Sequence, residues 1–439
     1  MMAVSADDIR ASFASALSEM YRQEVPQYGT LLEIVSEINT HSADQLRDGA
    51  EHRVEVERHG AIRLGKPAEL RTMRQLFQIM GMDPVGYYDL SIAGLPVHAT
   101  CFRPLSKKSL SQNPFRVFTS LLRLEMVEDI GLRTRAQEIL CARQIFTPRC
   151  LELIEQWQRS HAFSPLEATE FITEALETFR WHRATTVDRG TYQAMQVVHP
   201  LIADIVCFRG PHINHLTPRV VDIEAAQVEM LKRGLQAKDH IEGPPRRQCP
   251  ILLRQTSFLA LEERVAFSDG AEADGKHRAR FGEIEQRGMA LTPKGRLLYD
   301  SLIQKSGQRA WPSSAPDIHQ FPDDYAKIRE EGLGYFTYHA TNPSSMRAGR
   351  CGDLESLIQD GVVSFEPITY EDFLPISAAG IFKSNLNGES TASADSRADK
   401  DSFETHLGVP VHDPFDLYQR MQEASITETF ETLGSSIPS

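Results

Sequence analysis

The segment RVEVERHGAIRLG, residues 53–65, sets the architecture that we predict for the chain. Residues alternate along it with a period of two, which is typical of a strand and places His59 and Arg63 on one face. The next segment, KPAELRTMRQLFQIMGM, predicts a helix, because Pro67 suits a first turn and apolar residues recur at helical spacing. PVGYYDLSIAGLPVHATCFRP then predicts two short strands around a turn at Gly94. The predicted order is therefore strand, helix, strand, strand.

This order returns later in the chain, although the two halves share little sequence identity. CFRGPHINHLTPRVVD predicts a strand, IEAAQVEMLKRGL a helix, and CPILLRQTSFLALEERVAF and HRARFGEIEQRGMAL further strands. We therefore predict an α+β fold of two pseudo-symmetric βαβββ modules of the vicinal-oxygen-chelate type, which close around one metal. The four expected segments are the N-terminal helices with the first module (1–112), a helical insert (113–200), the second module (201–292) and a C-terminal extension that packs on the site (293–439).

Composition narrows the class of protein. A chain of 439 residues with 41% hydrophobic residues can bury a large core. Lys and Arg total 47 against 60 Asp and Glu, and the net charge of -13 disfavours binding to nucleic acid or to an anionic membrane. The six cysteines form no CxxC pair, and the sequence shows neither a charged-then-apolar leader nor a long apolar span. We expect a soluble cytoplasmic protein that acts on small molecules.

Two histidines stand three residues apart in RGPHINHLTPR, residues 209–219. The two prolines remove amides that a helix would need, so the segment reads as a strand. In a strand, His212 and His215 point to opposite faces, and at most one of them lines a given pocket. We favour His215, because it shares its face with Ile213 and so faces away from solvent, and we keep His212 as the alternative.

A carboxylate completes a candidate metal site. Glu283 and Glu285 lie on the same face of the predicted strand in GEIEQRG, so periodicity does not separate them. We choose Glu283, the nearer to Phe281, and assign Glu285 to pairing with an arginine or to orienting a ligand. Two imidazoles, from His59 and His215, and one carboxylate are what a non-haem Fe(II) centre with open positions requires. A single histidine on a strand is more often exposed or hydrogen-bonded than bound to a metal. The hypothesis therefore rests on the three residues together.

Arg63 is the candidate for recognising a substrate. It shares a strand face with His59, and a guanidinium can grip a carboxylate through two parallel hydrogen bonds. The alternative is a surface ion pair with Glu55 or Glu57. The sequence alone weighs these two interpretations equally.

Several further blocks of sequence can be read together along the chain. The blocks are ERHGAIRLG, GMDPVGYYDLSIAGLPVHATCFRP, NPFRVFTSLLR, GPHINHLTPRVVDI, IEGPPRRQCPILLRQTSF, RFGEIEQRGMALT and EDFLPISAAGIFKSNL. Together they resemble one enzyme family, the 2-oxoadipate dioxygenase/decarboxylases, also called hydroxyglutarate synthases. The resemblance covers nearly the whole chain, and many of its blocks run for eight or more residues in the same order.

The resemblance implies an Fe(II)- and O₂-dependent enzyme that converts the 2-oxo diacid 2-oxoadipate to 2-hydroxyglutarate and CO₂, in lysine catabolism. The keto oxygen and adjacent carboxylate of the substrate would chelate the iron, so no separate 2-oxoglutarate is needed. It also implies the roles of residues. The metal ligands fall on His59, His215 and one glutamate of GEIEQRG, taken as Glu283; the substrate arginine is Arg63.

The same resemblance marks the PISAAG segment as a substrate contact. Its small residues permit close backbone approach, and its successive amides suit an anion. We therefore expect Ile376 and Ser377 to contact the substrate, beside His59, Arg63 and His215. The alternative is that SAAG is an ordinary helix start.

Two other functions fit the same predicted scaffold. One is a metal-dependent isomerase or hydrolase of a small polar substrate, with the glutamate as base. The other is a metal-free protein that binds a small ligand by shape. Oxygen consumption separates the first from a dioxygenase, and bound iron in the purified protein separates the second.

Overall fold

The structure is a computed structural model. Its described residues are 3–42, 50–270, 275–278, 280–305, 316–341, 353–374 and 396–434. Contacts within the chain divide it into two compact units. The first unit comprises residues 1–241, 255–286 and 373–411, and the second comprises 242–254, 287–372 and 412–439.

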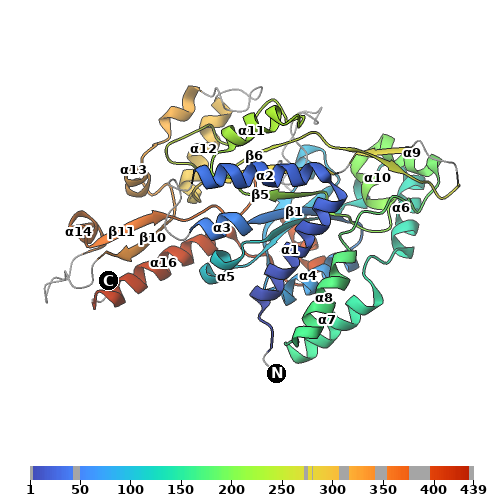
Figure 1. Ribbon diagram of the computed structural model, residues 1–439, viewed down its shortest axis with the longest axis horizontal. Helices are drawn as coiled ribbons and strands as arrows, with labels where there is room; N and C mark the ends of the chain where they lie inside the picture. Colours follow the sequence, from blue (N-terminus) through green and yellow to red (C-terminus); the bar gives the residue numbers. More distant parts are fainter. Residues whose placement is uncertain are drawn as a thin grey trace. The chain divides into compact units, whose positions relative to one another are not determined.

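A mixed five-stranded sheet forms the centre of the first unit (Figure 1). Its strands are β1 (Arg58–Leu64), β2 (Asp83–Asp89), β3 (Val97–Arg103), β4 (Arg116–Leu122) and β5 (His215–Pro218). They lie in the order β2-β3-β4-β1-β5. β1 runs parallel to β4 and antiparallel to β5, so it lies inside the sheet with both edges hydrogen-bonded. Every β1 residue after Arg58 is buried, as expected of a central strand.

Helices cover this sheet and extend beyond it. They are α1 (Ala6–Glu24), α2 (Pro26–His41), α3 (Ala50–Val56), α4 (Pro67–Ile79), α5 (Lys107–Gln112), α6 (Ile130–Ala142), α7 (Pro148–Ser160), α8 (Pro165–Glu177), α9 (Arg189–Val198), α10 (Pro200–Val206), α11 (Ile223–Lys232) and α15 (Ser396–Leu407). α4 packs on β1 and β2, and its Phe77 lies in one core with Ile62 and Leu64 of β1. None of the helices in the described ranges is both long enough and apolar enough to cross a membrane.

Local signals explain where the helices of the middle segment begin. Thr147 caps α7, whose first residue is a proline, and Ser164 and Glu167 form a reciprocal capping box at the start of α8. These caps satisfy backbone N–H groups that a helix start leaves without partners. α7 and α8 lie side by side (Figure 1).

Four more strands follow α11. They are β6 (Leu253–Ser257), β7 (Glu262–Val265), β8 (Gly275–Arg278) and β9 (Glu283–Arg287). β6 pairs with β9, and β7 pairs with β8. Within the first unit, a parallel bridge between Arg219 and Glu285 places β9 beside the end of β5.

The second unit contains a two-stranded sheet and helices. Its elements are α12 (Pro293–Lys305), α13 (Tyr325–Glu330), β10 (Phe336–Ala340), α14 (Leu354–Gln359), β11 (Val363–Pro367) and α16 (Pro414–Thr432). β10 and β11 are antiparallel, and α16 packs on β10. Ser425 of α16 accepts a hydrogen bond from the Tyr338 amide, and Thr429 donates one to the Tyr338 carbonyl.

The prediction of an α+β fold is confirmed, and three local predictions are wrong. Residues 53–56 belong to helix α3, because an alternation of only a few residues also fits a helix, and the Arg53–Glu57 ion pair at i, i+4 supports one. The strand predicted within residues 209–219 is confined to His215–Pro218. The segment expected to be helical from residue 113 begins with strand β4, all of whose residues are buried.

Tyr21 links α1 by hydrogen bonds to the backbone just before strands β5 and β9. Its buried hydroxyl lies 3.0 Å from the Asn214 carbonyl oxygen and 2.8 Å from that of Phe281. These residues directly precede β5 and closely precede β9. Burial raises the pKa of Tyr21, which keeps the hydroxyl protonated as a donor.

We expect Tyr21→Phe to lower the free energy of unfolding by about 1–3 kcal/mol, because two buried carbonyls lose their shared donor. Chemical denaturation measures the loss. Tyr28→Phe is the matched control: it removes a buried hydroxyl that bonds the Ser18 side chain on the neighbouring helix, and it should cost less. If Tyr21→Phe unfolds with the same free energy as wild type, the two hydrogen bonds of Tyr21 do not stabilise the fold.

Candidate metal centre

Three strands bring His59, His215 and Glu283 together. Their ligand atoms all lie within 4.8 Å of one another. His59 Nε2 lies 3.1 Å from Glu283 Oε2, and His215 Nε2 lies 3.6 Å from the same oxygen. All three side chains are buried, and the two imidazole rings meet edge to face. The residues come from β1, β5 and β9, far apart in the sequence, and converge on one point.

Several polar atoms of this cluster are buried without hydrogen bonds. Among the described residues, neither ring nitrogen of His215 has a hydrogen-bond partner, and neither has Glu283 Oε1. Unpaired buried polar groups are costly and rare in folded proteins. Three such atoms in one cluster therefore indicate a place for a ligand that satisfies them. Nitrogen and carboxylate oxygen donors fit a divalent transition metal.

Neighbouring groups fix the orientation of Glu283. Its Oε2 accepts hydrogen bonds from Thr217 Oγ1 and Gln255 Nε2, each at 3.0 Å. Thr217 stands on β5 and Gln255 on β6, so two strands hold the carboxylate. The oxygen that they hold is the one that faces both histidines, so the carboxylate is fixed within the cluster.

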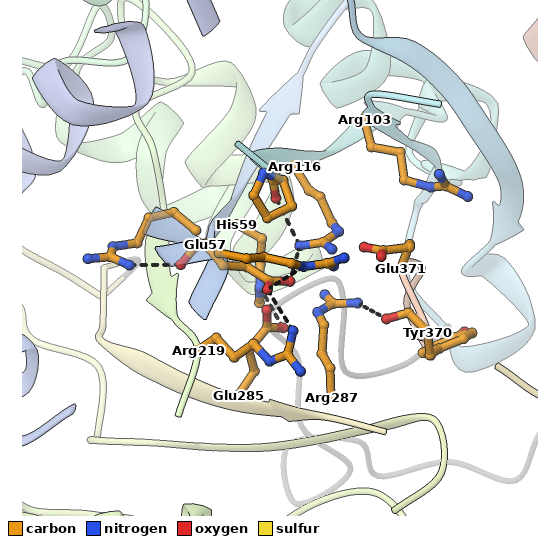
Figure 2. A network of polar contacts seen from close by, with 12 residues as sticks. Glu57, His59, Arg103, Arg116, Arg219, Glu285, Arg287, Tyr370 and Glu371 are labelled. Carbon is orange, nitrogen blue, oxygen red and sulfur yellow. Dashed lines mark hydrogen bonds and ion pairs between the residues drawn. The ribbon is translucent and has the colours of Figure 1, made fainter. Parts of the chain in front are cut away.

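His59 lies between two carboxylates. Glu283 faces its Nε2, and Glu285 Oε2 lies 2.9 Å from its Nδ1 (Figure 2). Burial alone would lower the pKa of His59, but the charges of Glu285 and Glu283 and their hydrogen bonds raise it overall. A carboxylate on Nδ1 leaves Nε2 as the metal-facing nitrogen, which is the usual arrangement around metal-bound histidines.

His215 has the opposite electrostatic environment. Burial, and then the positive charges of His59 and Arg63, hold the pKa of His215 well below its usual value. Its imidazole is therefore neutral near pH 7, as a metal ligand must be. The ring packs against Phe281 at 4.9 Å between centroids, and Phe373 packs on His59 at the same distance.

Local packing explains how β1 presents His59. Gly60 follows it, and a Cβ at this position would lie 2.6 Å from Ile213 Cδ1 and 3.1 Å from the His215 carbonyl oxygen. Glycine thus allows the chain around β5 to approach closely. Just before β1, Glu57 is buried, accepts a hydrogen bond from Arg219 Nη1 at 2.8 Å and forms an ion pair with Arg116 Nη1 at the same distance (Figure 2). These ion pairs fasten the start of β1 to β4 and to the end of β5.

Arg63 is buried rather than on the surface, with a relative exposure of 8%. Its Nη1 donates to Asp204 Oδ2 at 2.6 Å, so the structure supplies a partner that neither sequence interpretation named.

His212 does not join the His59 cluster; it lies 3.3 Å from Asp204 Oδ1, in a second cluster with His277. Ile376 and Ser377 lie outside the described residues.

Sequence reasoning missed four polar residues around these clusters: Thr217, Gln255, Asp204 and His277. Asp204 left a signal, because it is the only charged residue in PLIADIV, a helix in which every residue from Leu201 onward is buried. A lone carboxylate in such a run needs a buried partner. The other three carry ordinary polar side chains on strands, and only their neighbours in space distinguish them.

Comparison with known proteins places the chain among enzymes. A family model described as 2-oxoadipate dioxygenase/decarboxylase matches residues 13–385. The chain is 52% identical over 444 residues to the 2-oxoadipate dioxygenase/decarboxylase of Escherichia coli K12, with 96% of this chain and 98% of the relative covered. The corresponding protein of Mycobacterium bovis is 40% identical over 429 residues, covering 94% and 96%.

Solved structures agree with these relatives. The hydroxyglutarate synthase of Pseudomonas putida, crystallised in complex with 2-oxoadipate, matches with a TM-score of 0.91 and 49% identity over 98% of this chain and 99% of that chain. Another structure of the Pseudomonas putida enzyme gives a TM-score of 0.88 and 46% identity, with 98% and 99% covered. The chain therefore belongs to the 2-oxoadipate dioxygenase/decarboxylase family of enzymes.

Proposed function

We propose that this enzyme uses Fe(II), held by His59, His215 and Glu283, to convert 2-oxoadipate and O₂ to 2-hydroxyglutarate and CO₂, as a step of lysine catabolism. The observation that carries the proposal is the buried triad with unpaired donor atoms, in a chain of this family. Oxidation is favoured over metal-dependent isomerisation, hydrolysis or metal-free binding, because the curated relatives are dioxygenases.

The donor set supports iron as the metal. Two imidazoles and one carboxylate leave coordination positions open for substrate and oxygen, as in other non-haem Fe(II) oxygenases. When bound, the iron supplies a Lewis acid for the 2-oxo acid group and the electrons that activate O₂. A softer, thiolate-rich set would favour other metals.

The protein's own groups provide orientation and exclude water. Glu285 fixes the ring of His59 from Nδ1, while Thr217 and Gln255 fix the carboxylate of Glu283. Phe281 and Phe373 pack on the two imidazoles and keep bulk water from the cluster. A dry, pre-oriented site strengthens each electrostatic contact with the substrate.

Arg63 is the residue that we propose for the distal carboxylate of the substrate. It stands on the same face of β1 as His59, and its buried guanidinium is held by Asp204. Gripping the distal carboxylate would fix the length of diacid that reaches the metal. Ile376 and Ser377 remain proposed substrate contacts on the strength of the family resemblance alone.

The topology supports two pseudo-symmetric modules around this site. In the first module, β1, α4, β2, β3 and β4 follow in order, and its first and last strands are parallel neighbours. After β5 and α11, the chain returns in β9, which lies parallel to the end of β5. The triad residues stand on the first strand of each half and on the last strand of the second. The segment boundaries at residues 200 and 292 stay predictions, whereas the boundary predicted at residue 112 would separate β4 from the first module.

Anaerobic reconstitution with Fe(II) tests the proposed function. On admission of O₂, we expect 2-oxoadipate to be consumed with equimolar uptake of O₂ and release of CO₂. Both atoms of O₂ would enter 2-hydroxyglutarate, one in its new carboxylate and one in its hydroxyl group, while the CO₂ would come from the carboxylate next to the keto group. A chelator should stop turnover, and Fe(II) should restore it. Measurement uses an oxygen electrode and trapped CO₂. Turnover of 2-oxoadipate without oxygen uptake would contradict the proposal.

A further inference from the structure

A second buried cluster lies next to Arg63. Asp204 on α10, His212 before β5 and His277 on β8 place their ligand atoms within 4.8 Å of one another. His277 Nε2 lies 2.8 Å from Asp204 Oδ1, and His212 Nε2 lies 3.3 Å from it. The other carboxylate oxygen, Oδ2, accepts from Arg63 Nη1 at 2.6 Å. Asp204 thus joins two histidines to the arginine.

This cluster differs from the His59 triad in how its polar atoms are paired. The Tyr192 hydroxyl lies 2.9 Å from His277 Nδ1, and Asn214 Nδ2 lies 3.3 Å from His212 Nε2. Within the described ranges, no side-chain atom of Asp204, His212 or His277 is buried without a partner, whereas His215 and Glu283 together have three such atoms. A satisfied network needs no metal to complete it. A cation there would also lie beside the positive charge of Arg63.

The network is anchored from several directions. Asp204 belongs to a helix that is buried almost throughout, and Tyr192 stands on α9, which packs against that helix. Trp181 stacks on His277 at 5.9 Å and meets His212 edge to face at 4.6 Å. Burial would raise the pKa of Asp204, but the neighbouring charges and hydrogen bonds hold it well below its usual value, so the carboxylate is ionised.

An ionised, anchored carboxylate has two effects on an arginine. It compensates a buried positive charge when no substrate is present, since such a charge is costly when unpaired. It also restricts a long side chain that otherwise loses much rotamer freedom on binding a ligand. Restraint before binding lowers the cost of binding.

We propose that Asp204 is a positioning residue, which holds the guanidinium of Arg63 where it meets the distal carboxylate and so sets selectivity for diacids over monoacids. The inference rests on the proposed function, because it takes Arg63 as the carboxylate-binding residue. His277 supports this role by contacting Asp204, and Tyr192 supports it by contacting His277.

Asp204→Asn tests the proposal, because it keeps the shape of the side chain and removes its charge. We expect kcat/KM for 2-oxoadipate to fall roughly 10- to 100-fold, mostly through KM, since a charge-assisted hydrogen bond is lost. For 2-oxohexanoate, which lacks the distal carboxylate, the fall should stay below about 3-fold on the same reasoning. The iron content should not change. Steady-state kinetics with both substrates and metal analysis give these values.

A double-mutant cycle separates positioning from general support. Arg63→Met removes the guanidinium at similar length, and in that background Asp204→Asn should change kcat/KM for 2-oxoadipate by less than about 2-fold. Asp399→Asn is the matched control. It breaks another carboxylate–arginine pair of the first unit, in which Asp399 accepts from Arg123 at 2.9 and 3.1 Å, and should leave the substrate ratio unchanged.

Each other outcome has a defined meaning. Equal losses for both substrates, or full additivity with Arg63→Met, would overturn the positioning role, and so would loss of bound metal in Asp204→Asn. Unchanged 2-oxoadipate turnover in Arg63→Met would instead refute the proposed role of Arg63.

If Asp204→Asn does not fold, Tyr192→Phe is the second test variant, because it removes only the hydroxyl that contacts His277. It should shift the substrate ratio in the same direction by roughly 2- to 12-fold, the range of one neutral hydrogen bond, and an unshifted ratio would also overturn the proposal.

Discussion

His215→Ala is expected to remove bound iron and abolish turnover. Changes to groups that merely orient a ligand already weaken metal binding by roughly 10- to 100-fold, so loss of a direct ligand should cost at least that much. The fold should survive, because the ring nitrogens of His215 make no hydrogen bonds within the described structure and their removal leaves no new partner unsatisfied. Iron per chain, measured after anaerobic loading with Fe(II), and circular dichroism give the two readouts.

His212→Ala is the matched control, since it removes a buried histidine three residues away that belongs to the other cluster. It should keep its iron. Retention of iron by His215→Ala together with its loss from His212→Ala would overturn the assignment of the ligand. Glu283→Gln and Glu285→Gln make the same comparison for the carboxylates: iron loss confined to Glu285→Gln would exchange their roles.

Arg63→Lys is expected to lower kcat/KM for 2-oxoadipate by roughly 10- to 100-fold without lowering the iron content. Lysine keeps a charge that can still pair with Asp204, but it loses the planar fork that binds a carboxylate through two hydrogen bonds. The loss for 2-oxohexanoate should be much smaller, because that acid offers nothing for the fork to hold.

The decisive quantity is the ratio of kcat/KM for the two acids in wild type and variant. A ratio that does not change would place Arg63 at the metal-chelating end of the substrate or give it a purely structural role. A matching loss of iron would make the arginine part of the metal site itself.

Sequence periodicity located the first module well, because its elements are long enough to display their own repeat. α4 carries its apolar stripe over several turns, and β1, which precedes it, is buried from His59 to Leu64. The boundary before β1 was wrong because residues 53–56 are too few to distinguish a strand from a helix, and the ion pair between Arg53 and Glu57 favours the helix. β4 escaped notice as a strand because residues buried on both faces show no alternation.

For the site, the sequence predicted which residues take part, but not which atoms of these residues contact one another. Periodicity leaves Glu283 and Glu285 equivalent, whereas in space they occupy opposite nitrogens of the His59 ring. The ion-pair partner of Arg63 could not be predicted from the sequence for a different reason. Asp204 stands on a short helix 141 residues further along the chain, and no local pattern links the two. Long-range pairing of this kind depends on the whole tertiary fold.

The distance along the chain between the triad residues has a consequence for synthesis. His59 and Glu283 are separated by 224 residues, so at about 5–20 residues per second the ribosome adds the carboxylate roughly 11 to 45 seconds after the first histidine. β2, β3, β4 and β1 can pair early, but β1 keeps an open edge until β5 is made. The open edge of β1 promotes aggregation in that interval. The nascent chain can therefore complete the triad only after about two thirds of its residues have been added.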